Sequence, residues 1–268
     1  MKIGFIGFGH MAGAMAKGFL KSGHVSAEKV YACAQDFEKL KKRVAKPTDD
    51  GTPSILNSIN LEQMPVDIAR NADIIILAVK PNQVADVISP IKDELKNKVL
   101  ISVAFSWDFD KLNELIPETK HISIIPNTPC EVLTGMTLIE DKHNLSPDEL
   151  LMVERLLGSF GEIEYFSSDK IWLAGELTSC GPAFAAMFIE ALGDAGNKYG
   201  IEKEAAYRIV SQMVAGTGVL QMKTKKLPGT MVDEVATPGG VTIKGVTALR
   251  EANFHKVVEK AIDAIENN

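Results

Sequence analysis

The sequence contains few cysteines, and none of them is arranged as in a disulfide framework. Cys33, Cys130 and Cys180 are widely spaced, odd in number and not part of a C-x-x-C pair. The five histidines include no pair at a metal-ligand spacing such as H-E-x-x-H. These absences predict reduced thiols in a cytoplasmic protein and give no support to a metal site.

The chain also lacks an excess of positive charge and has no long apolar run. Against 35 acidic residues the chain has 29 lysines and arginines, a net charge of −6, so we expect no nucleic-acid partner. No apolar run approaches the roughly 18 residues of a membrane-spanning helix. Met1 and Lys2 lead directly into a strand-like run without a cleavage site for a signal peptide. We therefore expect no association with a membrane.

A glycine motif close to the amino terminus is the first positive signal. Residues 7–12 read G-F-G-H-M-A; they follow the apolar run 2–6 and open a helical pattern that ends before Gly23. In such a G-x-G-x-x-A turn, Gly7 would make the tight bend and Gly9 would let the backbone approach a pyrophosphate. Ala12 would keep the helix close to the sheet. The pattern predicts a dinucleotide site, although a purely structural turn is the alternative.

Further strands alternate with helices over the first two thirds of the chain. The predicted strands are 2–6, 30–34, 72–79, 98–104, 121–125 and, at the edge of the sheet, 162–166. The run 72–79 is apolar throughout, as in a parallel strand covered on both faces. Because the carboxyl ends of such strands line the ligand crevice, Ala78, Val79, Lys80 and Pro81 are expected beside the cofactor.

The end of the second strand leaves the type of cofactor open. An acid there binds the ribose of NAD, whereas neutral or basic groups leave room for a 2′-phosphate. Gln35 comes first and Asp36 next, and Lys39 and Arg43 lie close behind in a basic run. That run is also what a solvated helix face contains.

From Ser167 onward only helical patterns remain. The predicted helices are 182–199, 202–225, 231–236, 241–252 and 254–266. The first is apolar around most of its circumference and rich in small residues, which predicts burial against another subunit. We predict an α/β Rossmann-type doubly wound sheet with a second, all-α dimerisation domain. Its dinucleotide-binding domain would span residues 1–166, and the helical dimerisation and substrate domain residues 167–268.

A second turn, at residues 237–242, reads T-P-G-G-V-T and leads directly into a helical pattern. Adjacent glycines permit close approach of a ligand, and bare N–H groups at the head of a helix favour a negative charge. The turn together with the Thr242 hydroxyl therefore suits a small carboxylate. An ordinary helix-entry turn is the alternative.

Taken together, these motifs resemble the pyrroline-5-carboxylate reductases. The resemblance lies in I-G-F-G-H-M at 6–11, A-V-K-P at 78–81, P-N-T-P at 126–129, S-C-G-P-A-F at 179–184 and T-P-G-G-V-T-I at 237–243. It implies a Rossmann domain, an intertwined helical dimer and reduction of 1-pyrroline-5-carboxylate to L-proline by NADPH, with NADH possible. A homodimer is the implied assembly, and the resemblance leaves larger oligomers of dimers open.

The resemblance also implies roles for individual residues. Gly239, Gly240, Val241, Thr242 and Ser179 would bind the imino acid substrate, with Thr242 as the catalytic residue near the ring nitrogen. The implied cofactor contacts are Ile6, Gly7, Gly9, His10, Met11, Gln35, Ala78, Val79, Lys80, Pro81, Ala104 and Asn127.

Two departures from the family pattern leave other readings open. Phe105 replaces a small residue after the fourth predicted strand, where it could narrow the crevice, and Gln35-Asp36 replaces the serine or arginine frequent in the family. One alternative is a related imine or β-hydroxyacid reductase. Another is a dinucleotide-binding regulatory protein without turnover.

Overall fold

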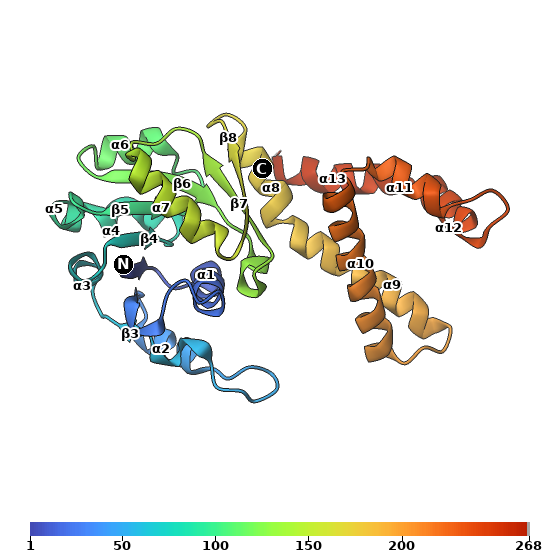
Figure 1. The fold of residues 1–268 in the computed structure, drawn as a ribbon, viewed down its shortest axis with the longest axis horizontal. Helices are drawn as coiled ribbons and strands as arrows, with labels where there is room; N and C mark the ends of the chain where they lie inside the picture. Colours follow the sequence, from blue (N-terminus) through green and yellow to red (C-terminus); the bar gives the residue numbers. More distant parts are fainter. Residues whose placement is uncertain (267–268) are drawn as a thin grey trace. The chain divides into compact units, whose positions relative to one another are not determined.

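The computed structural model describes residues 1–266 of the chain. They form two compact units, Met1–Ser179 and the described residues from Cys180 onward (Figure 1). The first unit holds all the strands, and the second is helical throughout its described part.

The first unit is built on one eight-stranded sheet. Its strands are β1 (Ile3–Ile6), β2 (Val30–Cys33), β3 (Asn60–Leu61), β4 (Ile74–Leu77), β5 (Val99–Ser102), β6 (Lys120–Ile125), β7 (Gly135–Glu140) and β8 (Gly161–Phe166). They lie in the order β3-β2-β1-β4-β5-β6-β7-β8, and the pairing is parallel except between β6 and β7. The chain moves outward from β1 through β2 to β3 and then returns to the other side of β1. The carboxyl ends of β1 and β4 are therefore the topological switch point, where doubly wound sheets bind ligands.

Helices cover both faces of this sheet. They are α1 (His10–Lys21), α2 (Phe37–Ala45), α3 (Pro65–Asn71), α4 (Val84–Ile88), α5 (Lys92–Leu95), α6 (Phe109–Leu115), α7 (Pro147–Gly158) and α8 (Ile171–Ser179). Ile74 and Ile76 of β4 pack in one cluster with residues of α1, α2 and α7. Ile75 and Leu77 pack in a second cluster with α3 to α6. Alternate residues of one continuous apolar strand thus face opposite layers, which confirms the predicted doubly wound architecture.

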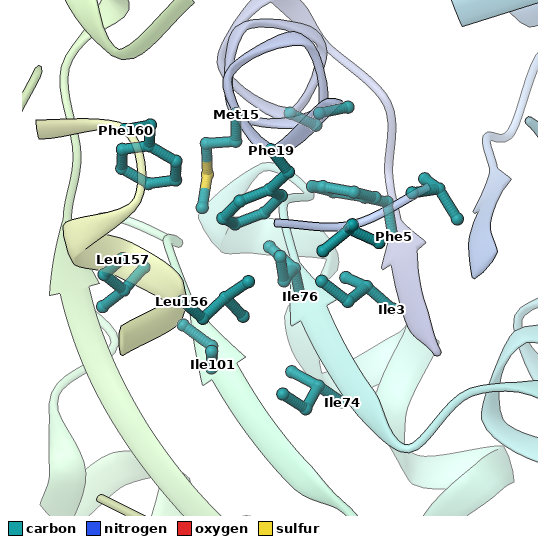
Figure 2. Close-up of a cluster of buried hydrophobic side chains, with 14 of the residues drawn as sticks. Ile3, Phe5, Met15, Phe19, Ile74, Ile76, Ile101, Leu156, Leu157 and Phe160 are labelled. Atoms are coloured by element: carbon teal, nitrogen blue, oxygen red, sulfur yellow. The ribbon is translucent and has the colours of Figure 1, made fainter. Parts of the chain in front are cut away.

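Figure 2 shows the first cluster, where α1 lies against the sheet. The rings of Phe19 and Phe160 have centroids 4.9 Å apart, and Phe5 is 6.4 Å from Phe19. All three side chains are fully buried. Each such aromatic contributes about 1.5–3 kcal/mol relative to an exposed position. This core holds the start of α1 at the end of β1, where the glycine motif lies.

All six predicted strands are confirmed, and α7 begins with a capping box. Ser146 Oγ accepts a hydrogen bond from the Glu149 amide, and the Glu149 carboxylate accepts one from the Ser146 amide at the start of α7. The predicted edge strand is β8, at the end of the sheet. Two strands, β3 and β7, were not predicted. β3 has only two residues, and β7 is recognisable chiefly through its pairing with β6 and β8.

The helix α8 lies in the first unit, whereas the sequence placed the domain boundary between residues 166 and 167. Ile171 of α8 packs with Ile125 of β6 and Leu138 of β7. A Cβ at Gly175 would lie 2.5 Å from Ile125 Cδ1, so the helix sits directly on the strand. These contacts attach α8 to the sheet and place the division after Ser179.

The second unit contains the predicted helices with bounds shifted by a few residues. They are α9 (Gly181–Lys198), α10 (Lys203–Thr224), α11 (Pro228–Val235), α12 (Val241–Glu251) and α13 (Phe254–Glu266). The pair α9 and α10 packs closely, since a Cβ at Gly193 would lie 2.2 Å from the Tyr207 ring. The Tyr207 hydroxyl donates to Asp194 at 2.8 Å, which gives that carboxylate a structural partner. None of the described helices is long and apolar enough to cross a membrane.

Candidate active site

A cleft of about 690 Å³ opens at the carboxyl ends of β1, β2 and β4. Its floor is formed by the glycine turn after β1, and its walls come from α2, from the residues before α3 and from the segment after β4. The position is the topological switch point of the sheet, and the volume lies within the range of cofactor sites. The fold therefore predicts ligand binding here.

Gly7 shows why the turn after β1 needs glycine. Its φ is +86°, a conformation that side chains strongly disfavour. A Cβ on Gly7 would lie only 2.6 Å from the Ala78 carbonyl oxygen. The turn is fixed by hydrogen bonds from the Gly7 amide to Cys33 O at 3.1 Å and from the Ala78 amide to Ile6 O at 2.8 Å. The bend thus ties β1 to both neighbouring strands.

The helix α1 begins directly after this turn and presents its first N–H groups. Gly9 is the N-cap and supplies no side-chain hydrogen bond to them. A Cβ at Gly9 would meet no atom of the chain within 4 Å, so the space above its backbone is open. Unsatisfied N–H groups at a helix start attract an anion. A dinucleotide's pyrophosphate therefore fits this cradle.

The structure brings seven of the predicted cofactor residues into the lining of the cleft. They are Ile6, Gly7, Gly9, Gln35, Ala78, Val79 and Lys80. His10 and Met11 lie in the first turn of α1, beside the lining rather than in it. Pro81, Ala104 and Asn127 also lie outside it.

These last three residues have structural contacts of their own. The Pro81 carbonyl accepts a hydrogen bond from Trp107 Nε1 at 2.9 Å, and Ala104 is buried. Asn127 uses both ends of its amide: Nδ2 donates to Thr178 O at 3.1 Å and Oδ1 accepts from the Met136 amide at 2.9 Å. The Asn127 side chain thereby joins α8 to the start of β7. A cofactor contact by Pro81, Ala104 or Asn127 stays a prediction.

Sequence reasoning missed one side of the cleft. Lys39 and Arg43 of α2 line it, as do Gln63 to Pro65 before α3 and Gln83 with Asp86 after β4. The sequence left open whether the basic residues of α2 face a cofactor or form a solvated helix face. Their spacing of four residues directly after the strand end was the available signal, since such a pair shares one face of a helix. Gln63 to Pro65 follow the unpredicted β3, so their position at this sheet edge could not be foreseen.

Phe105 is not among the cleft-lining residues. It is 53% exposed and packs edge-on against Trp172 of α8, with ring centroids 5.0 Å apart. Its neighbour Ser106 has a φ of +62°. The loop after β5 is therefore held in a bent conformation by an aromatic pair within the first unit.

Glu140 and His121 are fully buried and lie outside the cleft lining. Burial raises the pKa of the Glu140 carboxyl, although Phe109 N and Ser168 Oγ donate hydrogen bonds to it at 2.8 and 2.5 Å. Burial also lowers the pKa of His121, whose ring stacks on Phe109. Both groups belong to the packing of β6 and β7 against α6 rather than to the cleft.

In the second unit, the turn before α12 has the geometry expected of an anion site. Gly239 adopts a φ of +79°, and the Gly240 amide closes the turn by donating to Thr237 O at 3.0 Å. Gly240 is the N-cap of α12 and contributes no side-chain hydrogen bond to the helix start. Val241 and Thr242 are exposed in the first turn. Ser179, the remaining predicted substrate residue, is exposed at the end of α8 in the first unit.

The doubly wound sheet, the glycine turn and the cleft define a dinucleotide-binding oxidoreductase with an additional helical unit. Comparisons with known proteins agree. Residues 2–106 match the family described as NADP oxidoreductase coenzyme F420-dependent, and residues 169–268 match pyrroline-5-carboxylate reductase dimerisation. The pyrroline-5-carboxylate reductase of Treponema pallidum is 34% identical over 98% of both chains. The chain belongs to the pyrroline-5-carboxylate reductase family.

Other relatives extend this similarity to distant organisms. The Escherichia coli pyrroline-5-carboxylate reductase is 32% identical over 97% of this chain and 94% of its own. A solved structure of Plasmodium falciparum pyrroline carboxylate reductase with NADP bound has a TM-score of 0.84 and 29% identity. It covers 98% of this chain and 95% of the other. The likeness therefore includes both units and not only the nucleotide fold.

Proposed function

We propose that the protein reduces 1-pyrroline-5-carboxylate to L-proline with NADPH or NADH as the hydride donor. The observation that carries this proposal is the full-length similarity to pyrroline-5-carboxylate reductases, at 34% identity over 98% of both chains for the first relative above. Support comes from the cleft in the first unit and from the glycine turn before α12, because the reaction needs a dinucleotide and an anchored carboxylate.

The proposed cofactor site uses the glycine turn and the ends of the strands. The first N–H groups of α1 would bind the pyrophosphate, while Gly7 and Gly9 leave room for it. Ala78 to Lys80 would lie along the nicotinamide half. When bound, the reduced nicotinamide supplies the hydride. The chain's own task is to position an electrophilic carbon about 3–3.5 Å from the donor.

The proposed substrate site uses the start of α12. Backbone N–H groups of Val241 and Thr242 would hold the carboxylate, which the helix dipole also favours, while the Gly239-Gly240 turn leaves room for it. The Thr242 hydroxyl would donate a hydrogen bond to an unprotonated ring nitrogen, which makes the C=N carbon more electrophilic. If the substrate binds as the iminium, hydride addition alone completes the reduction and no general acid is needed.

The start of α9 lacks the lysine that an alternative reaction, the oxidation of a β-hydroxy acid, normally uses. The β-hydroxyacid dehydrogenases of similar architecture rely on a lysine on the helix that enters the second domain, and α9 carries none before Lys198. Lys170, just upstream of α8, is exposed and lies 3.9 Å from Asp169. The chain therefore supports imine reduction better than oxidation of a hydroxy acid.

We also infer a homodimer, with larger oligomers open, and a reducing compartment such as the cytoplasm. The dimer is supported by the match of residues 169–268 to a dimerisation family. The compartment is supported by the three free cysteines. Burial raises the pKa of Cys33 to about 11 and that of Cys130 to about 12, so neither thiol is reactive.

Steady-state kinetics with pyrroline-5-carboxylate and each cofactor test the proposal. Thr242→Ala is expected to lower kcat about 10- to 100-fold, the value of a hydrogen bond to a charged or developing-charge group. NADPH affinity should stay nearly unchanged, and Thr242→Ser should recover most of the rate. Thr247→Ala, on the same helix, is the matched control. Cofactor binding without any oxidation in the wild type would instead favour a regulatory protein.

A further inference from the structure

The side of the cleft formed by α2 carries two positive charges that form no ion pair within residues 1–266. Lys39 and Arg43 are four residues apart and therefore lie on one face of α2. Both line the cleft. None of the ion pairs formed between described residues includes either side chain. Unpaired cations beside a nucleotide cleft indicate an anionic ligand group.

Arg43 is also held in a defined position. Its Nη1 donates to the Phe8 carbonyl oxygen at 2.9 Å, so the guanidinium is attached to the glycine turn itself. A guanidinium has five N–H donors in a planar fork, which suits phosphate oxygens. Since this is the hydrogen bond that Arg43 makes within residues 1–266, the remaining donors stay available. The arginine is thus pre-organised at the edge of the cradle.

The residues at the end of β2, Gln35 and Asp36, carry no positive charge of their own for a phosphate. Gln35 is neutral, and its Oε1 accepts a hydrogen bond from Gln83 Nε2 at 3.2 Å. Asp36 is the N-cap of α2, and its Oδ1 accepts from the Lys39 amide at 2.9 Å. One of its carboxylate oxygens is therefore engaged with the helix. In nucleotide-binding sheets of this type, the end of β2 faces the 2′ position of the adenosine ribose.

We propose that Arg43, assisted by Lys39, binds the 2′-phosphate of NADPH and makes NADPH the preferred cofactor. This inference rests on the proposed use of a nicotinamide cofactor. The charge for the 2′-phosphate would come from α2 rather than from the strand end, where Gln35 carries none. Asp36 acts in the opposite direction, because a carboxylate near a ribose 2′-hydroxyl favours NADH. Arg43 and Lys39 outweigh this one acid at the end of β2; the other acid of the cleft lining, Asp86, comes from α4.

Isothermal titration calorimetry on the full chain tests the proposal without relying on turnover. The ligands are NADPH, NADH, adenosine 2′,5′-bisphosphate and adenosine 5′-monophosphate, and the last pair differs only by the 2′-phosphate. Arg43→Gln is expected to weaken the binding of NADPH and of the bisphosphate about 10- to 100-fold, the value of a hydrogen bond to a charged group. NADH and the monophosphate should change less than about threefold. Lys39→Gln should weaken the binding of NADPH only about 2- to 5-fold, because the Lys39 side chain is exposed to solvent.

Two controls separate charge recognition from damage to the glycine turn. Lys42→Gln removes a positive charge from the same helix outside the cleft and should change neither affinity. Lys39→Gln leaves the Arg43 hydrogen bond to Phe8 in place. If Arg43→Gln weakens NADPH and NADH equally, or if the wild type binds NADH as tightly as NADPH, the proposal is overturned. Failure of the wild type to bind either cofactor would instead count against the proposed function.

Discussion

Every residue of β1, β4 and β5 in the first unit is buried, whereas α11, α12 and α13 of the second unit contain no buried residue. All fully buried polar and charged side chains of the described chain also lie in the first unit. In the second unit large apolar side chains such as Met187, Leu220 and Val257 are 55–67% exposed. A soluble fold rarely leaves so much apolar surface uncovered.

The difference indicates that the two units reach stability by different routes. The first closes two hydrophobic clusters around its own sheet and can hold a rigid cleft. The second has helices whose apolar faces need another protein surface, which agrees with its match to a dimerisation family. The proposed homodimer supplies that surface. Variants in each unit test whether the first closes its own core and the second needs a partner surface.

The largest effect is expected at Gly216 of α10. A Cβ there would meet no atom of this chain within 4 Å, whereas at Gly18 of α1 it would lie 2.5 Å from Cys130 O. Gly216→Leu should therefore be tolerated within one chain, and helix propensity even favours it by about 1 kcal/mol. If α10 packs against a second copy, overpacking should weaken the dimer roughly 5- to 150-fold for each copy.

Sedimentation equilibrium of the wild type and of Gly216→Leu measures this change. Gly158→Leu in α7 is the matched control, because a Cβ at Gly158 likewise meets nothing within 4 Å. The control should leave the assembly unchanged. A Gly216→Leu dimer as tight as the wild type would show that this face of α10 is not covered by a partner, and the contrast between the units would need another explanation.

A smaller effect is expected from Glu140, a buried acid with no counterpart in the described part of the second unit. Its pKa is raised by burial, so the folded state holds the proton at pH values where the unfolded chain has lost it. The free energy of unfolding should therefore fall as pH rises from the usual carboxyl range through the raised pKa. Glu140→Gln should remove this slope. Its amide can still accept from Phe109 N, and the Ser168 hydroxyl can turn to accept from it.

Urea unfolding between pH 4 and pH 7 gives the free energy of unfolding of the variant and of the wild type, and the two values are subtracted at each pH. The subtraction cancels the contribution of His121. Because the pKa of His121 is lowered, its contribution to the free energy of unfolding changes with pH in the opposite direction, near the usual pKa of histidine. Glu164→Gln, on the exposed edge strand β8, is the control and should leave the slope intact. A slope that persists in Glu140→Gln would mean that another group causes it.

The fold of the first unit was largely predictable because its signals are local. The run of isoleucines in β4 needs cover on both faces, and a glycine turn after β1 can begin a nucleotide-binding helix. Strand β7 was not predicted because its six residues become a strand only through pairing with distant partners. The helix α8 was not predicted, and its residues were placed in the second domain because their packing on Ile125 cannot be read from the sequence.

The candidate site was predictable where backbone conformation demands a residue type. Gly7 and Gly239 both have positive φ, and both belonged to motifs that the sequence displayed. The role of Arg43 was left open for the opposite reason. Its function depends on which side of α2 faces the cleft, and that follows from the burial of Leu40 and Val44 on the neighbouring face. Only the packed structure separates this arginine from solvated lysines of the same run.

The smallest expected effects come from two residues with positive φ, one in each unit. Ser106 has a φ of +62° and Lys225, the C-cap of α10, a φ of +55°. Neither side chain makes a hydrogen bond or ion pair among the described residues, and both backbone contacts survive substitution. Ser106→Gly and Lys225→Gly should each stabilise their unit by about 0.5–1 kcal/mol, the left-handed penalty less the entropy of glycine.

Thermal unfolding at several protein concentrations then separates the two units. Ser106→Gly should raise, by a few degrees, a transition whose midpoint does not depend on concentration, because the first unit closes its own core. Lys225→Gly should raise a transition that moves upward with concentration, because a dimer gains stability by mass action. If both variants shift one and the same transition, the units unfold together. The sheet would then owe part of its stability to the helical partner surface, and its closed core would not suffice to hold the cleft.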